Sequence, residues 1–261
     1  MKVIAIIPAR YESTRFPGKP LVKLGTKYII QHVYERALSS GLFDDVIVGT
    51  DDQRIFEAVE SFDGKVTLTG KQHKSGTDRI AEVCRKLPYY QDVEIVVNIQ
   101  GDEPFIAKEP LKKLIDVFND PKIEVASLMH KLTKDFKNPN IVKVVCDKDN
   151  FALYFSRSLI PFNFITHPAP RNLQLETRTP HPAPRTPQPV FYRHIGVYAF
   201  RKEALLKFVE LPVSKLEQVE KLEQLRLLEN GIRIKMIETD YEGCDINTPE
   251  DLEKAKKMLS K

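Results

Sequence analysis

Several features are scarce in this chain of 261 residues, and each scarcity argues against a class of protein. Only three cysteines occur, Cys84, Cys146 and Cys244, and no C-x-x-C or His/Cys metal spacing accompanies them. A disulfide framework or a structural zinc site is therefore not expected. No apolar run reaches ~18 residues, so we expect no membrane insertion. The first residues resemble a strand rather than a secretory signal, which predicts a cytoplasmic protein with reduced thiols.

A large excess of one charge is missing as well. The chain has 40 basic and 36 acidic residues, for a formal net charge of +4. Surfaces that bind nucleic acid are usually strongly basic, with aromatic residues interleaved among the basic ones, and this sequence has neither feature. We therefore expect no nucleic-acid partner. Local basic patches for a small anionic ligand remain compatible with this balance.

Strand-like and helix-like segments alternate along the chain, as judged from the spacing of apolar residues. Strands are predicted at 2–7, 45–49, 66–69, 93–98, 124–129, 142–146, 190–200 and 233–237. Helices are predicted at 28–40, 53–61, 78–86, 109–119, 202–208, 216–229 and 249–259. The early β-α-β-α order predicts an α/β fold with a doubly wound, mostly parallel, Rossmann-like sheet.

One segment interrupts this alternation. Residues 167–189 are rich in proline and contain two copies of His-Pro-Ala-Pro-Arg. Proline at this density prevents a helix or a central strand, so we expect a surface excursion of polyproline character. A solvated loop is the simpler interpretation, and a lid over a ligand site is the alternative. The chain as a whole, 1–261, is interpreted as a single domain.

The loop after the first predicted strand is the most informative part of the sequence. Residues 7–21, IPARYESTRFPGKPL, bring Arg10, Arg15 and Lys19 onto one loop together with Gly18. At this position in an α/β fold, backbone N–H groups and fixed cations can surround a polyphosphate. The residue order matches neither the Walker loop nor G-x-G-x-x-G. A solvated basic loop is the structural alternative.

A second candidate site follows the predicted strand 93–98. Asp102 stands at the carboxyl end of that strand, where open α/β sheets bind ligands, and could hold Mg²⁺. Gly101 would let the backbone approach a ligand, and Gln100 could bond a hydroxyl group. Asp245, just before the last predicted helix, could complete the metal site. A plain surface turn and a helix cap are the alternatives for these two segments.

Three further runs carry polar side chains that a ligand could reach. The pattern of residues 73–79 predicts a turn that leads into a helix. The first N–H groups of that helix could face a base or a phosphate, and an ordinary helix cap is the alternative. In the predicted helix 216–229, helical spacing gathers a polar stripe for a polyhydroxylated ligand or for solvent. Along 191–200, period-2 alternation puts a histidine and a tyrosine on one strand face. The residues concerned are Ser75, Gly76, Glu217, Glu220, Gln224, His194, Gly196 and Tyr198.

These segments, in this order, resemble the 3-deoxy-manno-octulosonate cytidylyltransferases, also called CMP-KDO synthetases. The resemblance covers nearly the whole chain. It is carried by IIPARYESTRFPGKPL, HKSGTDRIAEV, VNIQGDEPFI, NPNIVKVV, ALYFSRSLIP, RHIGVYAF, EKLEQLRLLENG and NTPEDLEKA. The first of these runs is shared with CMP-sialate synthetases, whereas the YFSRSLIP and RHIGVY runs favour the KDO enzymes.

The resemblance implies Mg²⁺-dependent transfer of CMP from CTP to the anomeric hydroxyl of KDO, with release of pyrophosphate. It also implies a homodimer in the bacterial cytoplasm that supplies lipopolysaccharide assembly. A segment of approximately residues 130–200 would form a smaller β subdomain for sugar binding and dimerisation. Two alternatives stay open, a CMP-sialate synthetase and a non-catalytic nucleotide-binding regulator of the same fold.

Matched motif by motif, the resemblance also implies roles for individual residues. Catalytic residues would be Arg10, Lys19 and Asp102. Nucleotide-binding residues would be Arg10, Arg15, Lys19, Ser75, Gly76, Arg79 and Gln100. Sugar-binding residues would be Gln100, Arg157, His194, Tyr198, Glu220 and Gln224, with the forked Arg157 suited to a carboxylate. Asp102 would bind the metal with either Asp245 or Asn247, because Asn247 stands where the family carries an aspartate.

Overall fold

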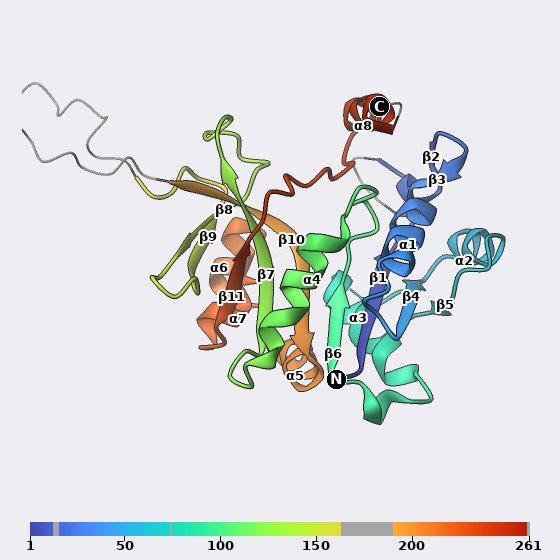
Figure 1. Cartoon of the computed structure of the whole chain (residues 1–261), viewed down its shortest axis with the longest axis horizontal. Helices are drawn as coiled ribbons and strands as arrows, with labels where there is room; N and C mark the ends of the chain where they lie inside the picture. The colour runs from blue at the N-terminus through green and yellow to red at the C-terminus, as the bar shows by residue number, and fades with distance from the viewer. Residues whose placement is uncertain (13–15, 74, 163–189, 260–261) are drawn as a thin grey trace, which may run out of the picture.

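A single twisted sheet with helices on both faces organises the computed structural model, which describes residues 1–12, 16–73, 75–162 and 190–259 (Figure 1). Its strands are β1 (Val3–Ala9), β4 (Asp45–Thr50), β5 (Val66–Leu68), β6 (Ile95–Asn98), β7 (Val125–Leu132), β8 (Lys143–Cys146), β9 (Ala152–Ser156), β10 (Phe191–Arg201) and β11 (Ile234–Glu238). A separate small hairpin consists of β2 (Lys23–Leu24) and β3 (Lys27–Tyr28).

The helices connect these strands in the order that the sequence predicts. They are α1 (Ile29–Ser39), α2 (Gln53–Glu60), α3 (Gly76–Lys86), α4 (Lys108–Asp116), α5 (Lys202–Glu210), α6 (Lys215–Glu220), α7 (Leu225–Glu229) and α8 (Pro249–Leu259). A short 3₁₀ helix, η1 (Lys19–Leu21), follows the first loop.

The strand order along the sheet is β11-β7-β10-β6-β1-β4-β5, and the β8–β9 pair is attached beside β10. Strands β6, β1, β4 and β5 pair in parallel, as do β11 and β7. Strand β10 runs antiparallel to both β6 and β7. The predicted α/β fold with a doubly wound, mostly parallel sheet is therefore confirmed.

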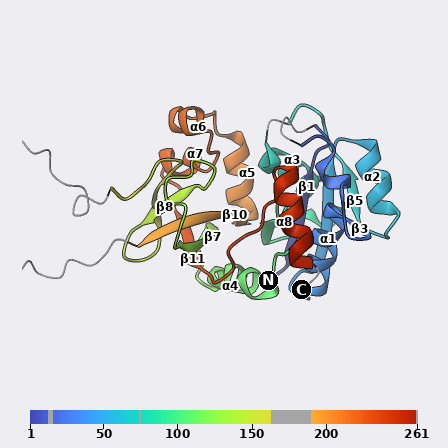
Figure 2. The same ribbon diagram turned by 90° about the horizontal axis from the view of Figure 1, so that it is seen from above.

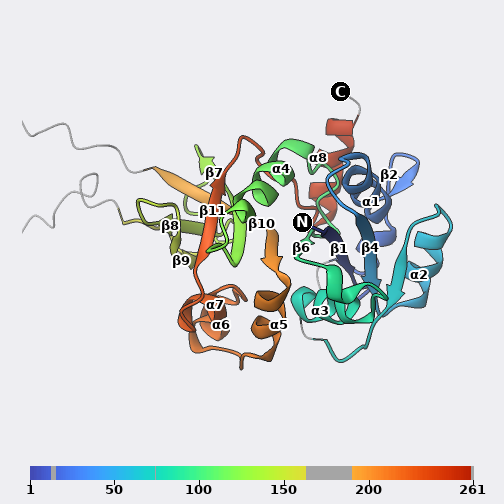
Figure 3. The same cartoon turned by 60° about the horizontal axis from the view of Figure 1, so that its bottom comes forward.

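Alternate side chains of β1 enter two different hydrophobic layers, because successive residues of a strand face opposite sides of a sheet. Val3, Ala5 and Ile7 join the layer formed with α1, α2 and α4. Ile4 and Ile6 join the layer formed with α3, α5 and α7. Figures 2 and 3 show α3, α5, α6 and α7 gathered along one side of the sheet. This double covering explains why β1 is apolar at almost every position.

The prediction of one continuous helix over 216–229 is wrong. The segment forms two short helices, α6 and α7, because the chain turns at Lys221, which adopts a left-handed backbone conformation with φ of 56°. After this turn the Arg226 guanidinium reaches back to Glu217, with Nη2 2.6 Å from Oε1, and both side chains are nearly buried. Of the apolar side chains in this segment, Leu222 and Leu225 are buried, but Val219 is 80% exposed.

The segment 130–200 contributes to the same sheet as the rest of the chain. It includes the end of β7, the β8–β9 hairpin and most of β10, with β8 bonded to β10. Strand β9 is not predicted from the sequence. The proline-rich run 167–189 lies outside the described residues. Among the residues that the structure describes, no helix is long and apolar enough to cross a membrane.

Candidate active site

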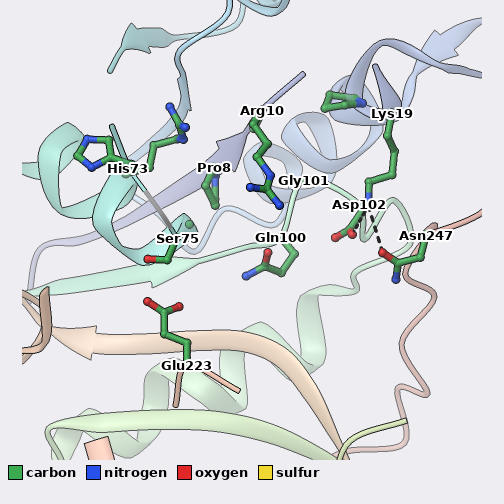
Figure 4. Close-up of a pocket in the computed structure, with 14 residues that line it drawn as sticks. Pro8, Arg10, Lys19, His73, Ser75, Gln100, Gly101, Asp102, Glu223 and Asn247 are labelled. Carbon is green, nitrogen blue, oxygen red and sulfur yellow. Dashed lines mark hydrogen bonds and ion pairs between the residues drawn. The ribbon is translucent and has the colours of Figure 1, made fainter. Parts of the chain in front are cut away.

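A cavity of about 370 Å³ opens at the carboxyl ends of β1 and β6, beside the start of α3 (Figure 4). Because β1 and β6 are parallel neighbours, the loops that follow them meet at one edge of the sheet, the usual ligand site of open α/β folds. The lining residues are Pro8, Ala9, Arg10, Lys19, Pro20, His73, Ser75, Gly76, Arg79, Gln100, Gly101, Asp102, Glu223 and Asn247. Nine of the residues that the sequence singles out belong to this set.

The first loop supplies two of the three predicted cations to the cavity. Arg10 follows β1 directly and points into the cavity toward Gln100 and Gly101 (Figure 4). Gly18 has a φ of 69°, a conformation that glycine adopts without strain. This turn leads into η1, which begins at Lys19. Arg15 lies outside the described residues, so its predicted role stays a prediction.

The turn after β6 packs tightly against the end of β1. A side chain at Gly101 would bring its Cβ to 3.1 Å from the Pro8 carbonyl oxygen, so only glycine fits without displacing backbone. This close approach brings Gln100 and Asp102 to the cavity from the same turn. The requirement for glycine between them is therefore steric.

Lys19 and Asp102 form an ion pair inside the cavity. Lys19 Nζ lies 2.6 Å from Asp102 Oδ2, and it also donates to Asn247 Oδ1 at 3.4 Å. Asp245 does not line the cavity; its carboxylate accepts from Arg193 Nη2 at 3.2 Å and from the Asn247 amide. Of the two predicted partners for Asp102, only Asn247 therefore faces the cavity.

Within the described ranges, no group of three or more His, Cys, Asp and Glu side chains is arranged to hold a metal ion. A magnesium site does not require such a group, because Mg²⁺ commonly takes one or two carboxylates and completes its shell with phosphate oxygens and water. The Asp102 and Asn247 oxygens that converge on Lys19 are of the type that Mg²⁺ prefers.

Glu103 joins the Asp102 turn to the loop that carries Asn247. Its buried carboxylate accepts from Tyr241 Oη at 2.6 Å and from the Cys244 backbone N–H at 3.0 Å. Burial raises the pKa of Glu103 to about 7, although these two hydrogen bonds act in the opposite direction. A backbone bond from Ile246 to the Asp102 carbonyl, 3.0 Å long, adds a second link between the two loops.

Helix α3 presents its N-terminus to the cavity, and its cap is complete. Ser75 Oγ accepts from the Asp78 N–H at 3.1 Å, and Asp78 Oδ2 accepts from the Ser75 N–H at 3.2 Å. The Ser75 side chain is thus occupied by capping, while Ser75 and Gly76 both line the cavity. The two interpretations of this turn, helix cap and ligand contact, are compatible. Arg79 also lines the cavity, and its guanidinium bonds Asp51 and Thr69.

Glu82 anchors the segment that precedes α3. Its carboxylate accepts from the Gly70 N–H at 3.0 Å, pairs with Lys86 Nζ at 2.6 Å and contacts the His73 ring. Burial would raise the pKa of Glu82, but the hydrogen bonds from Lys86, His73 and Gly70 outweigh it and lower the pKa to about 2. His73 lines the cavity, so this anchor acts directly on a cavity wall. His73 is not among the individual site residues predicted from the sequence.

We expect Glu82→Gln to lower the free energy of unfolding by about 2 kcal/mol at pH 7, after allowance for partial solvent exposure. The folded pKa lies below the ordinary value of 4.5, so the carboxylate stabilises the fold above about pH 5. This stabilisation is lost as the pH falls toward 2. Urea unfolding of both proteins at pH 7, 4 and 3 should show the difference shrinking with acidification. A constant difference, or one no larger than that of the exposed Glu60→Gln, would contradict this assignment.

The far wall of the cavity is formed by Glu223, which the sequence analysis missed. Glu223 Oε2 accepts a hydrogen bond from Thr77 Oγ1 at 2.9 Å, which links the segment between α6 and α7 to the start of α3. Glu223 Oε1 accepts no hydrogen bond from the described residues, and Arg226 Nη2 lies 3.9 Å away. Burial raises the pKa of Glu223. The only sequence signal for this residue is its place inside the EKLEQLRLLENG run.

Strand β10 extends the polar wall beyond Glu223. A Cβ at Gly196 would meet Gln100 Cγ at 3.8 Å, so the predicted glycine gap faces Gln100. The rings of His194 and Tyr198 lie 5.3 Å apart, and the Tyr198 hydroxyl is buried with no hydrogen-bond partner in the described part of the chain. Burial and the Glu223 charge raise the pKa of Tyr198. Burial lowers the pKa of His194 to about 3, so its ring is neutral near pH 7.

The remaining predicted sugar residues lie behind this wall rather than in the cavity lining. Glu220 accepts from Ser156 Oγ at 2.6 Å and from the Arg157 N–H at 3.0 Å. Arg157 Nε donates to the Glu220 carbonyl oxygen at 2.9 Å. Gln224 is buried at the start of α7. Glu220 and Arg157 are therefore neighbours, and their role in sugar binding stays a prediction.

A cavity lined by acidic and basic side chains, at the carboxyl ends of the strands of a doubly wound sheet, is typical of nucleotide-binding α/β proteins. Comparison with known proteins identifies the family within this class. The family model described as cytidylyltransferase matches residues 4–234. A solved structure titled CMP:2-keto-3-deoxy-manno-octonic acid synthetase complexed with CTP is 39% identical, with a TM-score of 0.84. The match covers 100% of this chain and 99% of that one.

Relatives of known function identify the family more closely. The 3-deoxy-manno-octulosonate cytidylyltransferase of Thermodesulfovibrio yellowstonii is 50% identical over 269 residues, covering 100% of this chain and 99% of the relative. The enzyme of the same name from Flavobacterium johnsoniae is 51% identical over 264 residues, covering 99% of each. The chain belongs to the 3-deoxy-manno-octulosonate cytidylyltransferase family, and the predicted family is confirmed.

Proposed function

We infer that this protein transfers CMP from CTP to 3-deoxy-manno-octulosonate (KDO), forming CMP-KDO and pyrophosphate for lipopolysaccharide biosynthesis. The observation that carries this inference is the cavity itself. Arg10, Lys19 and Asp102 lie at its near end, Glu223 forms its far wall, and Gln100 belongs to the same turn as Asp102. Groups suited to a polyphosphate and groups suited to a hydroxylated sugar acid thus share one cavity. Full-length similarity to enzymes named for this reaction supports the same conclusion.

The nucleotide half of the site lies between the first loop and α3. Arg10 and Lys19 carry the positive charge for the triphosphate, and both line the cavity. Ser75 and Gly76 at the N-terminus of α3 line the wall that we assign to the base and ribose. The Ser75 N–H is already bonded to Asp78, so Gly76 is the residue of this pair whose N–H we assign to the ligand. Arg79 supports this wall through Asp51, so we assign it to the shape of the base pocket.

A magnesium ion fits the residues at the near end of the cavity. Asp102 Oδ2 and Asn247 Oδ1 both bond the ammonium of Lys19, at 2.6 and 3.4 Å, so two oxygens already face one centre of positive charge. We propose that these two residues hold Mg²⁺ and that Lys19 then serves the phosphates. The ion would reduce the repulsion between the anionic sugar acid and the triphosphate. Asp245, which pairs with Arg193, is not assigned to the metal.

The sugar half of the site extends from Gln100 and Glu223 toward β10. Glu223 Oε1 and the Tyr198 hydroxyl accept no hydrogen bond from the described residues, and buried polar atoms of this kind are usually satisfied. Sugar hydroxyl groups would satisfy them. Arg157 is the candidate for the sugar carboxylate, because a guanidinium can bond both carboxylate oxygens. His194, Glu220 and Gln224 lie behind the cavity lining, and we assign them to the same sugar-binding region.

The chemistry that these residues support is an in-line displacement at the α-phosphorus of CTP. The sugar hydroxyl oxygen loses its proton to solvent and bonds to the phosphorus, while the bond to the bridging oxygen of the β-phosphate breaks and pyrophosphate leaves. Arg10 and Lys19 stabilise the negative charge that develops on the departing pyrophosphate. The enzyme acts mainly by holding two anions together in the required orientation.

We also propose that the enzyme is a homodimer in the cytoplasm, by analogy with its family. The three cysteines are free thiols, with Cys84 buried, as a reducing compartment would require. Sedimentation at micromolar concentration tests the dimer, since a monomer at that concentration would contradict it.

Pyrophosphate release with CTP and Mg²⁺ tests the sugar assignment when KDO, N-acetylneuraminate and no sugar are compared in parallel. Release should require KDO, because we assign the far wall of the cavity to that sugar acid. Release only with N-acetylneuraminate would identify a CMP-sialate synthetase instead. An absence of release with either sugar would favour a nucleotide-binding regulator and contradict the proposed reaction.

A further inference from the structure

Lys143 is a fully buried lysine at the start of β8, and the reaction proposed above does not use it. Its Nζ donates to three backbone carbonyl oxygens, those of Asn138 at 2.8 Å, Ile141 at 2.7 Å and Arg157 at 2.7 Å. All three donors of the ammonium are therefore occupied. Burial and the nearby Arg157 charge lower the pKa of Lys143.

Stability alone does not account for a charge at this position. Removing an ammonium ion from water carries a desolvation penalty, and here the ammonium is compensated by neutral carbonyl groups and not by a carboxylate. Even buried ion pairs can often be replaced by well-packed apolar residues with a neutral or stabilising effect. The three carbonyl groups also come from two separate segments, the loop 138–141 and the residue Arg157, so the ammonium links them.

The link bears directly on the Arg157 side chain. Arg157 Nη1 donates to the Pro139 carbonyl oxygen at 3.1 Å, and Nε donates to the Glu220 carbonyl oxygen at 2.9 Å. Pro139 belongs to the loop whose other carbonyl groups Lys143 holds. Two carbonyl oxygens, those of Pro139 and Glu220, therefore orient the guanidinium. Lys143 holds the loop that carries the Pro139 carbonyl, and it also bonds the backbone carbonyl of Arg157 itself.

We propose that Lys143 is a positioning residue, which sets the Arg157 guanidinium in the orientation needed to bind the carboxylate of the sugar acid. The proposal rests on the proposed function, in which Arg157 binds that carboxylate. A guanidinium forms two parallel bonds to a carboxylate only in a narrow geometry, so a displaced loop would weaken this contact. The nucleotide half of the cavity does not involve the loop 138–141 and should be unaffected.

Lys143→Gln, which removes the charge and one donor, tests the proposal by steady-state kinetics. We expect KM for KDO to rise at least fivefold, while KM for CTP stays within twofold of wild type. The matched control is Lys202→Gln, because Lys202 is also buried and donates to the carbonyl oxygens of Tyr90 and Gln91, at 3.3 and 3.1 Å. The control should lose thermal stability without a change in KM for KDO.

A double-mutant cycle separates positioning from general destabilisation. If Lys143 acts through Arg157, adding Lys143→Gln to Arg157→Met should produce no further rise in KM for KDO. Additive effects, an equal rise in KM for CTP, or an unchanged KM for KDO would each overturn the proposal. Should Lys143→Gln fail to fold, Lys143→Arg is measured in its place, since it keeps the charge but cannot direct one nitrogen to three carbonyls.

Turnover of KDO by the wild-type enzyme separates a failure of the proposed function from a failure of the proposed role of Lys143. If wild type does not use KDO, the proposed function itself fails, whatever the variants do. If wild type turns over KDO and Lys143→Gln matches it in both KM values, only the role of Lys143 is wrong.

Discussion

Asp102→Asn should lower kcat/KM by at least about a thousandfold, or about 4 kcal/mol of barrier, while leaving the fold intact. The substitution keeps the shape of the side chain but removes the charge that faces Lys19 at 2.6 Å and that we assign to Mg²⁺. Weaker metal binding should accompany the loss of rate. The measurement is pyrophosphate release at saturating KDO, together with Mn²⁺ binding followed by electron paramagnetic resonance in the presence of CTP.

Asp116→Asn is the matched control for this variant. Asp116 also pairs with a lysine, Lys112, but on the exposed surface of α4, where both side chains are at least half exposed. It should keep wild-type activity, because exposed ion pairs contribute little. An Asp102→Asn enzyme within tenfold of wild type would remove Asp102 from the metal role.

Lys19→Met should lower kcat/KM for CTP by about a hundredfold to a thousandfold. Methionine keeps most of the length of the side chain but lacks the ammonium, so the leaving pyrophosphate loses one of the two described cations that line the near end of the cavity. Because the charge develops during the reaction, a large part of the loss should fall on kcat. Initial rates over a range of CTP concentrations separate the two parameters.

Lys27→Met provides the comparison, since Lys27 lies in β3 and pairs with Glu35 at the surface. It should leave both parameters within twofold of wild type. If Lys19→Met raised only KM and left kcat unchanged, Lys19 would contribute to binding CTP but not to catalysis.

The architecture of the sheet could be predicted from the sequence because local patterns determine it. The apolar run of β1 and the amphipathic run of α1 mark a strand covered on both faces and a helix that covers one of them. Once the parallel order is known, the ends of β1 and β6 must lie together. The positions of Arg10 and Asp102 in one cavity follow from that geometry.

Features that depend on tertiary contacts could not be predicted in the same way. The break between α6 and α7 occurs at Lys221, which carries no glycine or proline signal, and is accompanied by the contact between Arg226 and Glu217. The same break brings Glu223 to the cavity wall. A helical wheel drawn over 216–229 assumes a continuous helix, so it selects Glu220 and Gln224 and misses Glu223.

The choice between Asp245 and Asn247 also depended on contacts across the chain. Both residues precede α8, and either could reach Asp102 on sequence grounds. In the structure Asp245 pairs with Arg193 of β10, whereas Asn247 bonds Lys19. Neither contact leaves a local pattern, because each joins segments more than fifty residues apart.

Cytidylyl transfer is tested most directly by ³¹P NMR of the enzyme with CTP, KDO and Mg²⁺. Transfer of the cytidylyl group predicts that the three CTP resonances disappear together and are replaced by one phosphodiester signal and pyrophosphate in equal molar amounts. Formation of CDP and inorganic phosphate, or CTP that persists in the presence of KDO, would contradict the account.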